Sequence, residues 1–110
     1  MATTFDNMLV KNIGLLSVET LQTDSSTRIT VVGLRLTNTY PSTVYATVSI
    51  RDDDGSTTAF VTKSLEISSN ETASILVNGE RLIMGTDNTL LISSDTDDSL
   101  DAVISYANIT

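Results

Sequence analysis

The chain has 110 residues and a formal net charge of −8, and it contains neither cysteine nor histidine. It therefore lacks disulfides, thiolate nucleophiles, zinc–thiolate sites and the commonest general base. The six scattered cations argue against a surface that binds nucleic acid, and no apolar run approaches the roughly 20 residues of a membrane span. Many β-branched residues in one chain of this length indicate a single all-β domain.

The first residues, Met1–Asn7, precede any periodic pattern and are expected to form a short N-terminal arm, leaving residues 8–110 as the domain. Such ends are commonly disordered, and the alternative is an arm that docks on a neighbouring subunit. The opening also lacks the basic and apolar regions of a signal peptide, so we expect no secretion signal. After Gly14, the stretch Leu15–Leu21 is interpreted as a strand, since no longer helical period follows it.

The central stretch, Thr27–Arg51, is expected to form two long strands joined by a turn. In the second strand, apolar and polar residues alternate without interruption from Thr43 to Arg51, which indicates one buried and one exposed face. In the first strand the apolar residues change parity between Val31 and Val32. One extra residue has this effect, so the pattern predicts a β-bulge that bends the strand and lets it serve both sheets or a sheet edge.

The second half contains two strong turn signals, Asp54-Gly55 and Asn78-Gly79, each of which predicts a hairpin. A strand with a kink at Ser64 is expected after the first, and the last strand is expected over Asp101–Ile109. About eight strands at intervals of roughly 8–12 residues are typical of an antiparallel sandwich. We therefore predict an all-β fold, a single antiparallel β-sandwich that is Ig-like or jelly-roll-like.

Two groups of acidic residues are the candidates for a metal site. The first is Asp52–Asp54, and the second contains Asp95, Asp97 and Asp98, which are weak candidates for calcium ligands because Ca²⁺ prefers carboxylate oxygens. An EF-hand is excluded, since the twelfth position from Asp52 is Lys63. Acidic loops between strands are common without metal. We favour that interpretation and expect no metal and no cofactor.

No arrangement of residues indicates an enzyme, and no catalytic residue is expected. Paired carboxylates hydrolyse glycosides only when a cleft raises one pKa, whereas both acidic groups lie on turns open to water. Ser and Thr have no histidine partner, and there is no glycine-rich phosphate loop. The outward row Thr43, Tyr45 and Thr47 is polar and uncharged, which suits a subunit interface. A single exposed aromatic side chain is otherwise incidental.

Six segments carry a resemblance to known proteins. They are KNIG at Lys11–Gly14, TVVGLRLTNT at Thr30–Thr39, V-x-A-x-V from Val44, VTK at Val61–Lys63, NGERLIMGTDNTLLISS at Asn78–Ser94, and the closing SLDAVISYANIT. In order and spacing they resemble a group of small virion proteins of tailed phages, mostly described as structural proteins. One turn departs from the pattern, because Ser68–Thr72 reads SSNET where members often carry an A-G-x-S-type turn.

The resemblance implies a non-enzymatic structural protein of the virion, made in the host cytoplasm. The first hypothesis is a capsid decoration or cement protein, a homo-oligomer that binds the major capsid protein in many copies and stabilises the head. The second is a neck, tail or fibre-attachment protein that binds another virion protein. The third belongs to a different class, a carbohydrate- or receptor-binding module, which the same fold supports.

Overall fold

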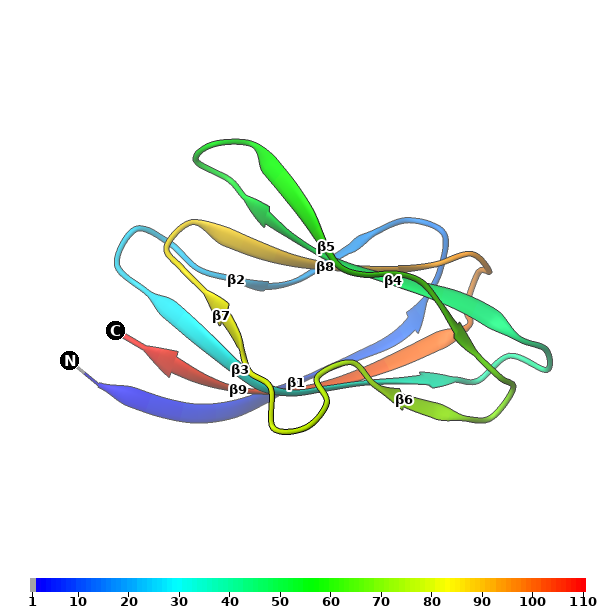
Figure 1. Cartoon of the computed structure of the whole chain (residues 1–110). Coiled ribbons are helices and arrows are strands. Elements are labelled where there is room, and N and C mark those ends of the chain that lie inside the picture. Colours follow the sequence, from blue (N-terminus) through cyan, green and yellow to red (C-terminus); the bar gives the residue numbers. More distant parts are fainter. Residues whose placement is uncertain (1) are drawn as a thin grey trace.

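The computed structural model describes residues 2–110, which form nine strands and no helix. The all-β prediction is confirmed, and the strands form two sheets that face each other as a sandwich (Figure 1). No helix in this part of the chain is long and apolar enough to cross a membrane. The strands are β1 (Thr3–Ile13), β2 (Val18–Gln22), β3 (Arg28–Asn38), β4 (Val44–Asp52), β5 (Thr57–Ile67), β6 (Thr72–Ser74), β7 (Leu82–Met84), β8 (Asn88–Ser94) and β9 (Leu100–Ile109).

Sheet A has the strand order β1-β9-β3-β6, with β7 also pairing with β3, and sheet B has the order β2-β8-β4-β5. Because β6 and β7 pair with opposite ends of β3, they occupy one interrupted strand position. Each sheet then has four strand positions, and the chain changes sheet after most strands. Of the two sandwich types left open by the sequence, this order selects the jelly roll.

The stretch Thr27–Arg51 is not a hairpin, because β3 lies in sheet A and β4 lies in sheet B. The connection between them is held by Asn38, which is fully buried. Its side-chain amide donates to the carbonyls of Ser42, at 2.8 Å, and Ile67, at 2.9 Å. Its Oδ1 accepts from the backbone N–H of Tyr40 at 2.8 Å. The alternating pattern indicated a buried face for each strand, but it contains no information on which strand is the neighbour.

The β-bulge predicted in β3 is confirmed. Val31 and Gly33 pair with consecutive residues of β9, Tyr106 and Ser105, so Val32 is the extra residue. β3 lies inside sheet A, between β9 and β6, and is therefore neither an edge strand nor shared between the sheets. The extra residue places Leu34 and Leu36 on the same inner face as Ile29 and Val31, which precede it. All four side chains are at most 4% exposed.

The N-terminal segment differs from the arm that was expected. Thr3–Asn7 belong to β1 and pair with residues 105–109 of β9 in unbroken register, so the sheet has no boundary at Asn7. All five residues are exposed. They join the sheet because pairing with β9 satisfies backbone hydrogen bonds, although they add no apolar side chain to the core. Met1 lies outside the described residues.

The two expected hairpins have different outcomes. β4 and β5 do form a hairpin, but its loop is longer than the two-residue turn expected at Asp54-Gly55, and the positive φ is at Ser56. Asn78 and Gly79 form a tight turn with φ of 56° and 75°, yet the strands around it pair with β3 and not with each other. The kink expected at Ser64 is confirmed by a φ of 54°. The backbone conformation of these turns is determined by the local sequence, whereas the pairing of the strands around them depends on the rest of the fold.

Candidate functional site

The acidic loop between β8 and β9 uses its carboxylates to hold neighbouring backbone. Asp95 Oδ1 accepts from the N–H of Tyr45 at 2.9 Å, and Asp97 Oδ1 accepts from the N–H of Leu15 at 3.2 Å. Asp98 has a positive φ of 51° in the same turn. Among residues 2–110, no group of three or more Asp or Glu side chains is arranged to hold a metal ion. The carboxylates of Asp95 and Asp97 thus have a structural role, as hydrogen-bond acceptors for backbone N–H groups.

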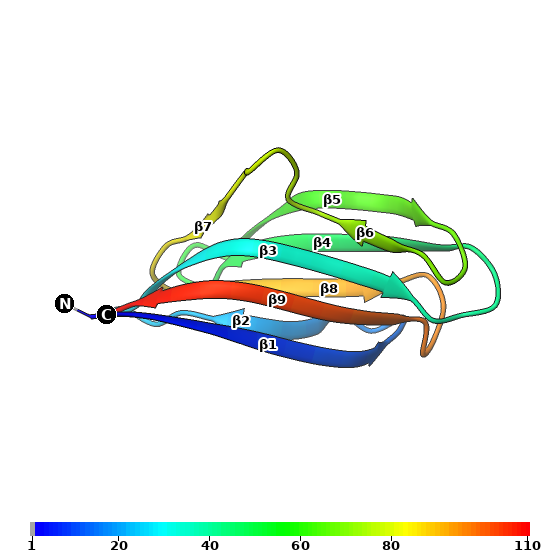
Figure 2. The same cartoon turned by 90° about the horizontal axis from the view of Figure 1, so that it is seen from below.

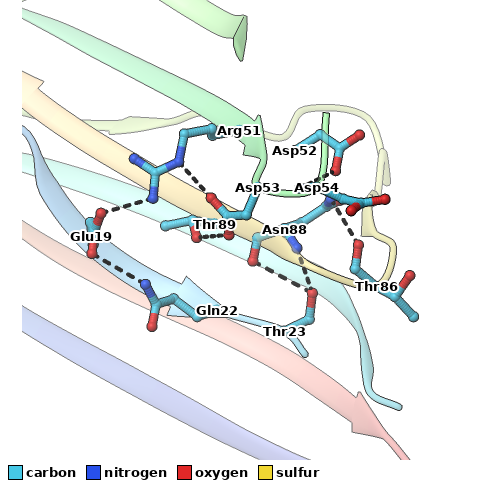
Figure 3. A network of polar contacts seen from close by, with 10 residues as sticks. All are labelled: Glu19, Gln22, Thr23, Arg51, Asp52, Asp53, Asp54, Thr86, Asn88 and Thr89. Atoms are coloured by element: carbon cyan, nitrogen blue, oxygen red, sulfur yellow. Dashed lines mark hydrogen bonds and ion pairs between the residues drawn. The ribbon is translucent and has the colours of Figure 1, made fainter. Parts of the chain in front are cut away.

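The other acidic group contributes to a polar network on the outer face of sheet B (Figure 3). Arg51 Nε donates to Asp53 Oδ1 at 2.6 Å, and Arg51 Nη2 donates to Glu19 Oε2 at 2.8 Å. The hydroxyl of Thr89 donates to Asp53 Oδ2 at 2.7 Å. These contacts connect β2, β4 and β8 with the loop after β4.

The electrostatics of this network favour the ionised form of Asp53. The hydroxyl of Thr89, followed by the guanidinium of Arg51, holds the pKa of Asp53 below its ordinary value. In turn, the hydrogen bonds to Asp53 and Glu19 raise the pKa of Arg51. A general acid needs a carboxyl with a raised pKa. Asp53 is therefore an ionised structural partner.

The three residues proposed for an interface lie at the outer side of sheet B. Tyr45 is 41% exposed, and Thr43 is exposed just before β4. Thr47 is half-buried, and its hydroxyl accepts from the N–H of Ser64 at 3.1 Å, where the pairing of β4 with β5 is irregular. The hydroxyl of Thr47 therefore supports the edge strand. Tyr45 is the residue of the three that offers a large exposed side chain.

The outer face of sheet A was not recognised from the sequence. Figure 2 shows β1, β9 and β3 side by side in this sheet. Leu9 of β1 pairs with Val103 of β9, which pairs with Arg35 of β3, while the adjacent pairs contain the buried Leu34 and Ile104. Register and burial together place five of the eleven exposed large apolar side chains on this face: Phe5, Leu9, Val32, Ile83 and Val103.

A shallow depression of about 360 Å³ lies at the bulge on this outer face. It is lined by Val32, Gly33, Arg35, Val103 and Ser105. The missing side chain of Gly33 contributes to the hollow, since a Cβ there would stand 3.7 Å from the Cβ of Ser105. The lining pairs apolar side chains with one guanidinium and one hydroxyl. It contains no carboxylate and, as the chain has no histidine, no base for Ser105. The lining therefore offers apolar side chains, one guanidinium and one hydroxyl.

Three cations share the outer face of sheet A with a single carboxylate. Lys11, Arg28 and Arg35 are exposed, and Asp101 accepts from the N–H of Asn12 at 3.1 Å. Within residues 2–110, the ion pairs are the two made by Arg51, so the cations of sheet A take part in none. The three cations are far apart along the chain and are brought to one face only by the pairing of β1, β9 and β3. A search for clustered charges in the sequence could not find them.

No protein-family model matches the chain, and no curated protein matches it in sequence. Several solved structures share its fold. A protein of the disulfide-linked pili that form Bacillus endospore appendages is 13% identical, with a TM-score of 0.59 over 98% of this chain and 88% of that chain. A chain of the T13 particle of infectious bursal disease virus is also 13% identical, with a TM-score of 0.58 over 96% of this chain and 30% of that chain.

A structure of the Gt strain of the same virus has 14% identity and a TM-score of 0.50 over 97% of this chain and 32% of that chain. This chain thus spans most of the appendage protein but only about a third of the two viral chains. At such identities the likeness shows a common fold, and the functions of the whole proteins are not carried over by it.

Proposed function

We propose that this chain is a non-enzymatic structural subunit of a virus particle, and that it decorates the capsid of a tailed phage as a cement protein. The observation that carries the proposal is the outer face of sheet A, where exposed apolar side chains lie beside cations without ion-pair partners among residues 2–110. Exposed apolar patches with polar surroundings mark contact surfaces for other proteins. A single core without disulfides that carries such a surface suits a protein whose function is to bind its neighbours.

Two further observations support this role. A fold similar to that of this chain occurs in a protein of the T13 particle of infectious bursal disease virus and in one of the Bacillus endospore appendages, both of which are large assemblies. The sequence segments from Lys11 onward resemble small virion proteins of tailed phages. In the proposed setting, the major capsid protein is the main partner, and many copies of this chain brace the junctions between capsid subunits.

The test is the copy number in purified particles, measured by quantitative mass spectrometry against the major capsid protein. Decoration requires on the order of hundreds of copies per particle, because each contact site is repeated by the capsid symmetry. About a dozen or fewer would instead indicate a neck, tail or fibre-attachment ring. Particles without the chain would overturn the virion role, and specific binding on a glycan array would then favour the carbohydrate-binding module.

A second measurement tests the cement role itself. Particles assembled without this chain are expected to release their DNA at a lower temperature than particles that carry it, because ligands that bind only the intact shell stabilise it. Adding the purified chain back should restore the higher temperature. Equal release temperatures with and without the chain would contradict a cement function even when the copy number is high.

A further inference from the structure

We propose that copies of this chain associate head-to-tail, with the outer face of sheet A in one copy packed on the outer face of sheet B in the next. This inference deepens the proposed function, on which it rests for its setting, by naming the surfaces through which neighbouring copies contact each other. It is carried by the charges and the apolar side chains of the two faces, which are opposite sides of the same sandwich (Figure 1).

The outer face of sheet A is positively charged in a strongly acidic protein. Three cations, Lys11, Arg28 and Arg35, lie there with one carboxylate, Asp101, which gives a local charge of +2. Since the whole chain carries −8, the remaining surface carries −10. This face therefore attracts acidic surfaces, and a second copy of the chain presents one.

A two-fold symmetric contact between two copies of sheet A does not fit this pattern. In such a contact the same patch meets itself, so each copy would place its three cations against the three cations of the other. Repulsion between like charges then opposes the burial of Phe5 and Leu9, which are 76% and 70% exposed. The charge pattern selects a partner surface of opposite sign.

The outer face of sheet B is negatively charged around Tyr45. Of its carboxylates, Glu19 and Asp53 are occupied by Arg51, as described above. Glu66 pairs with Tyr45 across the β4–β5 ladder and is exposed, and Asp95 holds the N–H of Tyr45. Tyr45, with its exposed side chain, thus has an acidic residue as its cross-strand partner and another at its backbone N–H. An aromatic ring with adjacent acids is a good contact for arginine side chains and for exposed apolar groups.

Each contact of this kind uses one face of sheet A and one face of sheet B, so every copy keeps one unused face for the next. The association is therefore heterologous, and it gives a closed ring or an open chain of copies according to the rotation between neighbours. Because the charges are exposed, the association is expected to weaken as salt screens them.

The first experiment is sedimentation velocity of the purified full chain over a concentration series at two salt concentrations. At about 20 mM salt we expect association that increases with concentration, and at about 500 mM we expect the apparent dissociation constant to rise at least about tenfold, since the screening length falls severalfold over this range. A chain that stays monomeric throughout the series at both salt concentrations overturns the proposal.

The second experiment uses one charge reversal on each face. Arg35→Glu alters the face of sheet A, and Glu66→Lys alters the face of sheet B. Each variant alone is expected to lose at least about tenfold in association, because a like charge replaces an attractive one. An equimolar mixture should associate again with equal amounts of both variants, because each contact between unlike variants joins either two unmodified faces or two faces of reversed and opposite charge. A mixture that remains monomeric, or an Arg35→Glu variant that associates normally, overturns the head-to-tail contact.

Matched controls separate this contact from general charge effects. Lys63→Glu makes the same charge change as Arg35→Glu but adds a carboxylate to sheet B, next to Phe60. There it should preserve or strengthen the association, whereas a general effect of the added negative charge would weaken it. Glu71→Lys makes the same change as Glu66→Lys but lies in the exposed turn before β6, and it should associate like the unmodified chain. Circular dichroism checks that each variant is folded. These measurements need no virus particle, so their failure is distinguishable from a failure of the copy-number test.

Discussion

The outer face of sheet B carries an ion-pair network, whereas the outer face of sheet A carries three cations that form no ion pair within residues 2–110. On sheet B, Arg51 forms ion pairs with Glu19 and Asp53, and the hydroxyl of Thr89 donates a hydrogen bond to the other carboxylate oxygen of Asp53. On sheet A, Arg35 lies beside the exposed Val103 and a shallow depression. Both faces are outer sides of antiparallel sheets, and they differ in whether their polar groups are satisfied within the chain.

This difference indicates which of the two faces is more suited to bind another protein. The charged side chains of the network on sheet B are 33–50% exposed, so water screens them and the net contribution of their ion pairs to stability is modest. Their effect is to orient side chains and to connect three strands. On sheet A no ion pair within residues 2–110 orients the cations, and large apolar side chains remain in water. A face that is unsatisfied in both respects gains most from binding another surface.

The largest difference in the free energy of unfolding is expected between substitutions on the inner and the outer side of sheet A. Leu34→Ala removes a fully buried side chain and should lower the free energy of unfolding by about 2–5 kcal/mol. Leu9→Ala, at a position 70% exposed, should change it by about 0.5 kcal/mol or less while weakening association. Urea unfolding of both variants at high salt measures this. Equal losses would show that Leu9 supports the fold and not a contact.

A smaller effect is expected from deleting Val32, the extra residue of the bulge. Val31 and Gly33 already pair with adjacent residues of β9, so the deletion leaves both registers and both sets of inward side chains intact. We expect a folded protein that loses about 1 kcal/mol, with a changed surface on sheet A. Backbone NMR contacts between β3 and β9 check the register, and Val32→Ala, which keeps the bulge, is the control. An unfolded deletion variant would show that the core depends on the bulge itself.

The network on sheet B should give a stability difference that depends on pH. The pKa of Asp53 is lower in the folded chain than its ordinary value of 3.8. Its ionised form therefore stabilises the fold above that value, and the stabilisation is lost as pH falls through the folded pKa. Asp53→Asn should unfold at lower urea than the unmodified chain at pH 6, and the gap should narrow below pH 4.

The control for this measurement is Asp54→Asn, in the same loop. The carboxylate of Asp54 forms no ion pair within residues 2–110, so this variant should follow the unmodified chain over the whole pH range. A gap between Asp53→Asn and the unmodified chain that stays constant from pH 6 to pH 3 would contradict the role of the charge on Asp53.

The smallest effect is expected at the loop that borders sheet B, where Asp95, Asp97 and Asp98 lie. Two of these carboxylates already accept backbone N–H groups, so calcium should add little. We expect the melting temperature to be the same in millimolar calcium and in excess chelator, measured by calorimetry. A clear rise with calcium, by the mass-action stabilisation that a bound ligand gives, would identify this loop as a metal site.

Much of the fold followed from the sequence, because alternation with period two and turn-forming residues act locally. Four features were predicted from such patterns and are present: the all-β class, the bulge beside Gly33, the kink at Ser64 and the last strand, β9. The outward position of Tyr45 follows from the same alternation. These features depend on neighbours only a few residues away, so local sequence patterns are sufficient to predict them.

Strand pairing and the composition of the outer faces were decided only in the tertiary structure. Nothing in the stretch Thr27–Arg51 says that its two strands enter different sheets, nor that Asn78-Gly79 joins two strands that pair with β3. In the sequence, the three cations Lys11, Arg28 and Arg35 are isolated from one another. They share one face only because β9 lies between β1 and β3 in sheet A. The physical reason is the same in each case. Pairing is a contact between distant segments, and its free energy depends on the whole sandwich, which no local pattern contains.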